Sequence, residues 1–282
     1  MKQNLFRAVW RVVNIALVVS LVALVYSAGW ELSVRDYLNG FGDAIIPLNA
    51  APEQRVEAIL QWMHNGAPRS AESNPTGLAV RDPETTLNYR QLLSVCGTAT
   101  NAFLNLARSA HLQVRRLLLL SPDRNTKHVV AEVLLNGRWI VVDPTFRMVM
   151  RNAKGEMLTR KELQNPQNFA EASARSPGYP AIYSYDKFAH VRFARLPLDG
   201  LRLRPVLDFV IPGWDEKVDW ILLLERESFF ALATATFATF LLLLLRQLLA
   251  WYADRRLKVS RFRLRSHVAR AGVAFFTTPE IK

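Results

Sequence analysis

The sequence has few of the residues that build disulfide, metal or nucleotide sites. It contains one cysteine among 282 residues, so no disulfide can form within the chain and the core must be stabilised by packing. It has no H-E-x-x-H, no paired C-x-x-C, no glycine-rich phosphate loop and no G-x-S-x-G. Zinc, nucleotide and serine-hydrolase chemistry therefore lack their minimal motifs. His111, His190 and His267 are scattered without ligand spacing, and we expect no metal and no cofactor.

Acidic residues are scarce at both ends of the chain. Residues 1–11 carry three Lys and Arg and no acid, and residues 246–282 carry nine against two acids. The remainder is nearly balanced, with 24 basic and 22 acidic side chains. Almost all of the net charge of +12 therefore lies near the two ends.

Two long uncharged runs stand next to these basic ends. Residues 12–30 form a run of 19 residues, and as a helix this run is about 28 Å long, which matches a bilayer core. Residues 228–245 form a second run of 18 residues, again of spanning length. The first run is long for the apolar region of a signal peptide, and its end, Tyr26-Ser27-Ala28, makes a poor cleavage site, so we expect an uncleaved anchor.

The charge distribution predicts how the chain crosses a membrane. Cytoplasmic flanks of spanning helices carry excess Lys and Arg, so both termini are expected inside. We therefore expect a two-pass protein of the bacterial inner membrane with cytoplasmic residues 1–11, spans at 12–30 and 228–250, a periplasmic domain at 31–227 and a basic tail at 251–282. Such a tail would also suit nucleic acid, but its place directly after a span favours anionic lipid. The expected partner is the lipid bilayer, with no nucleic acid.

A β-hairpin with a tight turn is predicted within the exported domain. Asn136-Gly137 lies between two runs of β-branched and aromatic residues, the pattern of a type I′ turn. With this two-residue loop, Asp143 falls opposite Val130, which shares a strand face with His128. The Cα atoms of His128 and Asp143 are then roughly 7–8 Å apart across the hairpin, so an imidazole and a carboxylate can meet.

The single cysteine is predicted to lie in the first turn of a buried helix. The apolar residues after it repeat at helical spacing: Ala99, Phe103, Leu106, Ala107 and Ala110. Ser94 suits an N-cap, and a thiol in the first turn has its pKa lowered by the helix dipole. First-turn N–H groups can also hold an oxyanion, and Gln91 is a further candidate donor. Cys96, His128 and Asp143 thus occur in the order that thiol acyl transfer requires.

These motifs resemble the transglutaminase-like superfamily of papain-like thiol enzymes, in a bacterial membrane-anchored form. The family pattern is Cys-Gly at a helix start, H-x-x-x-E-V opening a strand, G-x-W, and Asp-Pro. Over about residues 52 to 146 this chain reads Cys96-Gly97, His128 with Glu132-Val133, Gly137 with Trp139, and Asp143-Pro144. The resemblance implies an α+β fold in which a central helix bearing the cysteine packs on an antiparallel sheet, between two transmembrane helices. It also implies that Cys96 is the nucleophile, His128 the general base and acid, and Asp143 the residue that orients the imidazole.

This resemblance leads to two alternative predictions of function. The first is a membrane-tethered thiol acyl-transfer enzyme, such as an amidase, peptidase or acyltransferase, that acts on a cell-envelope substrate. The second follows from two departures, Val95 where the family often has Gly, and Val129-Val130 in place of a small-then-aromatic pair. On that alternative the domain is a non-catalytic binding or assembly module of an envelope or exopolysaccharide machinery. The expected partner is correspondingly an envelope peptide, protein or polysaccharide-machinery component.

Further elements flank the predicted site. Pro52 and Gly66 have the positions of a helix start and stop, and Thr159 with Glu162 forms a capping box that predicts a short helix. Three tyrosines cluster in a Pro- and Gly-containing stretch: Tyr179, Tyr183 and Tyr185. They form either a wall of a substrate groove or aromatic packing over the core edge. Residues 200–224 combine apolar side chains, arginines and two tryptophans, which predicts a membrane-surface element before the second run.

Overall fold

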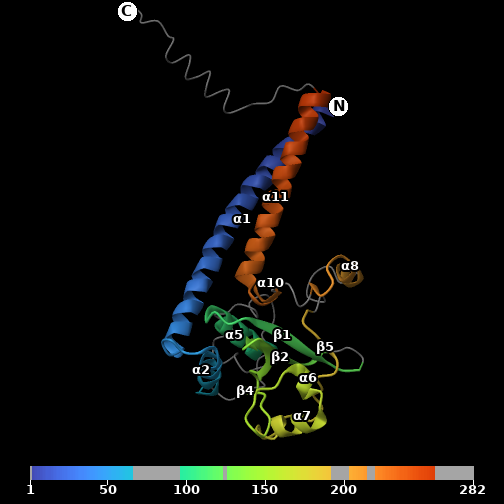
Figure 1. Ribbon diagram of the computed structural model, residues 1–282. Helices are drawn as coiled ribbons and strands as arrows, with labels where there is room; N and C mark the ends of the chain where they lie inside the picture. The colour runs from blue at the N-terminus through green and yellow to red at the C-terminus, as the bar shows by residue number, and fades with distance from the viewer. Residues whose placement is uncertain (1, 66–95, 123–125, 192–202, 215–219, 258–282) are drawn as a thin grey trace, which may run out of the picture. The chain divides into compact units, whose positions relative to one another are not determined.

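The computed structural model describes residues 2–65, 96–122, 126–191, 203–214 and 220–257 (Figure 1). Its contacts divide the chain into two units, one formed by Met1–Val25 with Ala235–Lys282 and the other by Tyr26–Thr234. In the first unit, Arg246 Nε donates to Asn14 Oδ1 at 3.0 Å. The second unit holds the sheet and the helices that cover it.

Two helices within the described residues are long and apolar enough to cross a membrane. Helix α1 runs from Lys2 to Ile45 and helix α11 from Glu227 to Tyr252, followed by the short π-helix η3, Ala253–Leu257. Their most apolar segments have mean hydropathies of 2.3 and 2.1 and are mostly exposed. Water disfavours so much exposed apolar surface, whereas acyl chains do not. Helix α1 continues beyond the predicted span of 12–30, so residues 31–45 are also helical.

A five-stranded antiparallel sheet forms the centre of the Tyr26–Thr234 unit, in the order β4-β3-β2-β1-β5. The strands are β1 Val114–Leu120, β2 Thr126–Leu135, β3 Arg138–Asp143, β4 Met148–Val149 and β5 Phe188–Ala189. The hairpin of β2 and β3 has the predicted turn, with φ of 50° at Asn136 and 76° at Gly137. Positive φ at both positions is the requirement of a type I′ turn. Leu135 pairs with Arg138, which confirms the predicted register.

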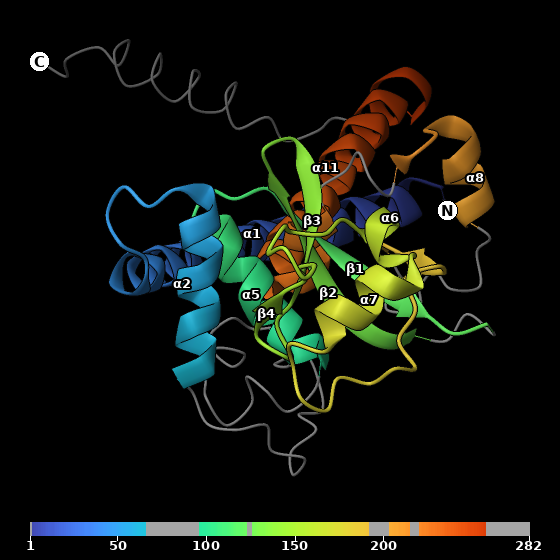
Figure 2. The same ribbon diagram turned by 60° about the horizontal axis from the view of Figure 1, so that its bottom comes forward.

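Two helices cover one face of this sheet. Helix α2, Pro52–Asn65, has the predicted bounds, and helix α5, Cys96–Ser109, packs between α2 and strands β1 and β2 (Figure 2). Their shared core is aliphatic and aromatic: Val56, Ile59, Leu60 and Met63 from α2, Ala99, Ala102, Phe103 and Leu106 from α5, and Ala131 and Val133 from β2. Full burial of one large side chain of this kind contributes about 1.5–3 kcal/mol. The helix that carries the cysteine is therefore held by a large core, and the fold is α+β, as expected.

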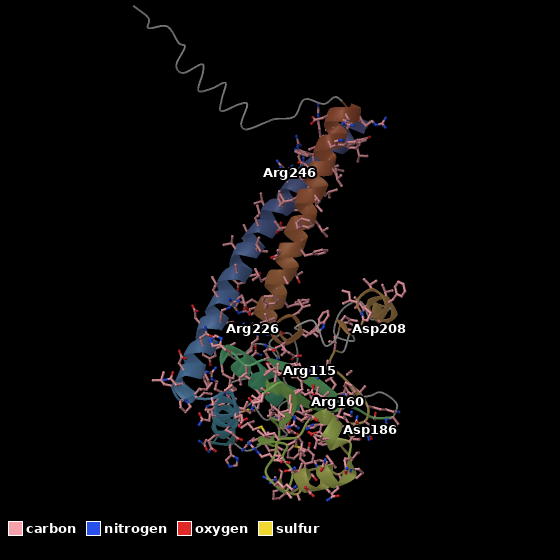
Figure 3. All side chains as sticks on the ribbon, viewed as in Figure 1. Arg115, Arg160, Asp186, Asp208, Arg226 and Arg246 are labelled. Atoms are coloured by element: carbon pink, nitrogen blue, oxygen red, sulfur yellow. The ribbon has the colours of Figure 1, made fainter. Side chains whose placement is uncertain are left out.

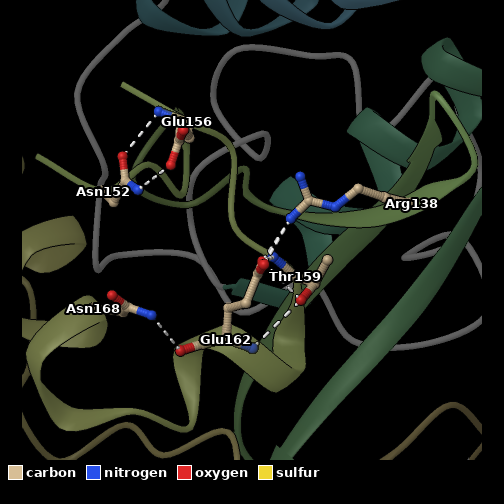
Figure 4. A network of polar contacts seen from close by, with 6 residues as sticks. All are labelled: Arg138, Asn152, Glu156, Thr159, Glu162 and Asn168. Atoms are coloured by element: carbon tan, nitrogen blue, oxygen red, sulfur yellow. Dashed lines mark hydrogen bonds and ion pairs between the residues drawn. The ribbon is translucent and has the colours of Figure 1, made fainter. Parts of the chain in front are cut away.

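A second core cluster joins β1, β2 and β3 to α6 (Arg160–Leu163), α7 (Pro166–Ser173) and two tyrosines that follow α7. Its members include Leu117, Leu119, Val130, Val141, Leu163, Ala172, Tyr179 and Tyr185. The predicted capping box is present at the start of α6. Thr159 N donates to Glu162 Oε2 at 2.8 Å, and Glu162 N donates to Thr159 Oγ1 at 3.3 Å (Figure 4). Arg138 also donates to Glu162, so this helix start is tied to the hairpin.

Buried charges join α5 to the segments that lead into the long helices. Arg226, labelled in Figure 3, donates to Glu31 Oε1 of α1 at 2.9 Å and to Asn105 Oδ1 of α5 at 3.2 Å. Ser228 Oγ donates to Glu31 Oε2 at 2.7 Å. A buried carboxylate is tolerated only when it is paired and hydrogen-bonded. These contacts meet that condition and fix α5 against α1 and the start of α11 within one unit.

A second ion pair extends this network to the sheet. Arg116 of β1 lies 2.6 Å from the carboxylate of Glu225, the last residue of helix α10, Trp220–Glu225. Asn101 of α5 donates to the same carboxylate at 3.0 Å and to the Glu225 carbonyl at 2.8 Å. Strand, cysteine-bearing helix and α10 therefore share one polar core.

Candidate functional site

The β2–β3 hairpin brings His128 and Asp143 into direct contact. His128 Nε2 lies 2.7 Å from Asp143 Oδ2, and both side chains are fully buried. The type I′ turn sets this meeting, because a shift of one residue would place the two side chains on opposite faces. The predicted contact is confirmed, and the catalytic role of the two residues stays a prediction.

Hydrogen bonds from every side hold the Asp143 carboxylate. Oδ1 accepts from the backbone N–H groups of Thr145 at 3.0 Å and Phe146 at 3.2 Å. Oδ2 accepts from the Tyr179 hydroxyl at 3.0 Å and faces the imidazole. Charge-assisted bonds of this kind are strong and directional, so the carboxylate has one orientation toward His128.

Cys96 is the first described residue of α5 and is half-buried. It packs against Leu118 of β1, Val129 of β2 and Ala189 of β5. The hydroxyl of Thr100, one turn further along α5, donates to the Val129 carbonyl at 2.9 Å. This bond fixes the cysteine-bearing helix to the residue that directly follows His128 in β2.

The imidazole responds to both predicted partners. Burial lowers the pKa of His128, but hydrogen bonds and charge interactions with Asp143 and Cys96 outweigh it and raise that pKa to about 9. Nε2 faces Asp143 at 2.7 Å, and Nδ1 is the other, buried nitrogen of the ring. Nδ1 is therefore the ring nitrogen that can face the thiol, whose hydrogen bond and charge both raise the pKa of the ring.

Aromatic rings enclose the His128–Asp143 pair. Tyr183 stacks on the imidazole, with ring centroids 4.1 Å apart and planes 2° from parallel, and Phe146 meets it edge-on at 6.0 Å. The Tyr179 and Tyr185 hydroxyls lie 3.3 Å apart. Burial, with Tyr185 and Asp143 nearby, raises the pKa of Tyr179, so this hydroxyl stays neutral and can donate to the carboxylate. The tyrosine cluster thus packs over the core edge, and it also contacts both members of the pair.

Sequence reasoning missed these tyrosine contacts because no local signal encodes them. Tyr179 is 36 residues from Asp143, and the loop between them has no repeating pattern that fixes its path. The only available sign was the clustering of three tyrosines in one stretch. That sign predicts an aromatic cluster but not its target.

Two residues of the recognised motif have a structural role. Glu132 of the H-x-x-x-E-V motif is buried and accepts from Arg115 Nε at 2.6 Å. The Arg115 guanidinium lies over the Trp139 ring of the G-x-W motif, 4.2 Å from its centroid. His190 Nδ1 lies 3.9 Å from the same carboxylate. The arginine neutralises the buried acid and joins the two strands of the hairpin.

Several predicted residues lie outside the described part of the chain. Gln91, Ser94 and Val95 belong to residues 66–95, so the oxyanion donor and the N-cap stay predictions. Within the described ranges, no three His, Cys, Asp or Glu side chains gather as a metal-binding group.

Comparison with known families matches part of this chain. The model of the Transglutaminase-like superfamily covers residues 41–144, which include Cys96, His128 and Asp143. No curated protein and no solved structure matched the chain. The matched stretch ends directly after Asp143, so the segment of Tyr179 to Tyr185 lies beyond it. Residues 41–144 are therefore a domain of the transglutaminase-like superfamily, carried on a chain with two helices that are long and apolar enough to span a membrane.

Proposed function

We propose that this chain is a membrane-tethered thiol acyl-transfer enzyme with Cys96 as nucleophile, His128 as general acid and base, and Asp143 as the orienting residue. The observation that carries the proposal is the buried 2.7 Å contact between His128 and Asp143, on a ring whose pKa also responds to Cys96. Purely structural histidines do not need a carboxylate on one nitrogen and a thiol near the other.

The chemistry follows from the protonation state of the ring. With a pKa of about 9, His128 is an imidazolium at neutral pH and favours the thiolate form of Cys96. The thiolate attacks the carbonyl carbon of a carboxamide, and the developing oxyanion is stabilised by N–H groups near the start of α5. His128 gives its proton to the leaving amine, which leaves a thioester on Cys96. Water or a primary amine then attacks this thioester and returns its proton to His128.

The proposed setting is the bacterial inner membrane, with residues 31–227 on the periplasmic face. Two exposed apolar helices and the basic excess beside both of them support this topology. A carboxamide of an envelope peptide or protein, held close to the bilayer, is the proposed substrate class.

The test is the alkylation rate of the single cysteine in the detergent-solubilised full chain. Iodoacetamide labelling followed by intact mass reports Cys96 alone, because the chain has no other thiol. At pH 6 an unperturbed thiol is only about 0.3% thiolate, whereas an ion-paired thiol is mostly thiolate. We expect fast labelling of the wild type near pH 6 and roughly 10- to 100-fold slower labelling of His128→Ala.

A matched control separates ion pairing from general damage. His64→Ala removes an exposed imidazole at the end of α2, and we expect it to label as fast as the wild type. Equal, slow rates in all three proteins, rising only at about pH 8 to 9, would mean an unactivated thiol and would favour the binding-module alternative. After fast labelling, a labelled primary amine offered as acceptor separates transfer from hydrolysis.

A further inference from the structure

Helix α8, Leu203–Val210, presents a stripe of exposed apolar side chains. Val206 is 56% exposed, Phe209 87% and Val210 64%, and Ile211 directly after the helix is 43% exposed. Positions 206, 209 and 210 have the i, i+3, i+4 spacing that places side chains on one face of a helix. No charged residue interrupts this face, which is unlike an ordinary water-facing helix.

Another side of α8 packs against the rest of the domain. Leu207 packs into a cluster with Val191, Trp214, Trp220 and Leu224. The Trp214 and Trp220 rings meet edge to face at 5.3 Å, and Trp220 Nε1 donates to the Trp214 carbonyl at 3.1 Å. The exposed stripe is therefore a fixed surface of the domain and not the result of a detached helix.

Asp208, the only acidic residue from 206 to 211, is hydrogen-bonded within this packed cluster. Trp214 Nε1 donates to Asp208 Oδ1 at 2.9 Å, and Asp208 is labelled beside α8 in Figure 3. This bond directs the carboxylate toward the packed tryptophan. The stripe itself presents no charge that would resist transfer into a hydrocarbon environment.

The place of this packed cluster in the chain indicates what the exposed stripe contacts. Leu224 belongs to α10, and only Arg226 separates α10 from α11, the proposed second span. The exposed stripe and the start of α11 thus belong to one packed piece of the Tyr26–Thr234 unit. Amphipathic helices with aromatic and aliphatic side chains on one face lie in the headgroup region of bilayers, and Arg202 and Arg204 precede this face in the sequence.

We propose that α8 is an interfacial helix that inserts Val206, Phe209 and Val210 into the surface of the bilayer that α11 enters. The proposal rests on the membrane anchoring put forward above and is independent of catalysis by Cys96. Together with the two spans, this contact would fix the domain, and with it the thiol site, at one height above the lipid surface.

Site-specific lipid quenching tests this placement in the full chain. In a Cys96→Ala background, single cysteines are introduced as Phe209→Cys, Ile182→Cys or Leu244→Cys and labelled with an environment-sensitive fluorophore. Ile182 is an equally apolar control, 63% exposed, in the tyrosine segment, and Leu244 lies in the second half of α11, within the proposed span. Because Phe209 is 87% exposed, its replacement leaves the core intact. Each protein is reconstituted in phosphatidylcholine–phosphatidylglycerol nanodiscs, with nitroxide-labelled lipids as quenchers.

The expected result distinguishes α8 from the anchor. Shallow nitroxides should quench the label at 209 at least about twofold more than the label at 182, with emission at shorter wavelength, and mid-chain nitroxides should quench the label at 244. Quenching at 244 with equal quenching at 209 and 182 would overturn the α8 proposal alone. If neither the label at 244 nor the label at 209 is quenched, both the α8 proposal and the membrane anchoring are overturned. A short-wavelength signal at 209 without lipid quenching would overturn lipid contact and indicate a protein partner, either a second copy of this chain or another protein.

Discussion

Replacement of Tyr183 by leucine should lower the pKa of His128. The Tyr183 ring stacks on the imidazole with centroids 4.1 Å apart and planes 2° from parallel, so the protonated ring lies over the negative face of the phenol. This contact favours the imidazolium over the neutral ring. Leucine is the informative replacement because it keeps an apolar cover over His128, which leaves the desolvation of the ring largely unchanged.

The size of the effect follows from two known quantities. A buried cation–π contact contributes about 1–2 kcal/mol, and one pKa unit corresponds to about 1.4 kcal/mol. Loss of the tyrosine ring should therefore lower the pKa of His128 by about one unit, from about 9 toward 8. Tyr183→Phe keeps the ring and removes only the hydroxyl, so this variant should titrate like the wild type.

Nuclear magnetic resonance of the imidazole Cε1–H group measures this midpoint directly. The chain has five histidines, and the spectrum of a His128→Gln variant identifies the relevant signal. An unchanged midpoint in Tyr183→Leu, or an equal fall in Tyr183→Phe, would refute the stacking argument. A rise in Tyr183→Leu would show that the tyrosine acts mainly by excluding water from the ring.

Two further predictions test the orienting carboxylate and the buried network. Asp143→Asn keeps the shape of the side chain but removes the charge that favours the imidazolium, so the His128 titration should move well below 9 in the same experiment. An unchanged midpoint would show that Asp143 does not set it. Arg226→Met removes the buried cation from Glu31, which keeps Ser228 and the longer contact of 3.4 Å with Arg35, and should destabilise the solubilised protein by up to about 3–5 kcal/mol. Arg35→Met removes the other, 53% exposed cation from the same carboxylate and should cost less than about 1 kcal/mol. Thermal unfolding compares the two variants, and equal losses would contradict a specific role for the buried pair.

The buried network also has a consequence for the proposed enzyme. Asn101 and Asn105 lie on the helix that begins with Cys96, and they contact Glu225 and Arg226, directly before α11. The helix that carries the thiol is thus bound to the chain segment that leads into the proposed anchor. Substitutions in this network are expected to disturb the site through the position of α5.

Local rules account for the half of the site that lies on the hairpin. Asn136-Gly137 can adopt positive φ at both positions, and that single turn fixes which residues of β2 and β3 are opposite one another. Because side chains alternate along a strand, the turn alone places His128 and Asp143 on a common face. Helix α2 and the capping box of Thr159 were predictable for the same reason, since their signals lie within a few residues.

The tertiary structure decided every feature that joins distant parts of the chain. Glu31 and Arg226 are 195 residues apart, and Tyr179 reaches Asp143 across 36 residues, so neither contact has a short-range pattern. Such pairs form only when packed helices and strands bring them together and burial makes an unpaired charge costly. The sequence by itself determined the turn, the hairpin register, the order of Cys96, His128 and Asp143, and two runs long enough to span a bilayer. Only packing determined that aromatic rings enclose the histidine and that the cysteine-bearing helix is bound to the start of α11, because burial depends on the whole fold.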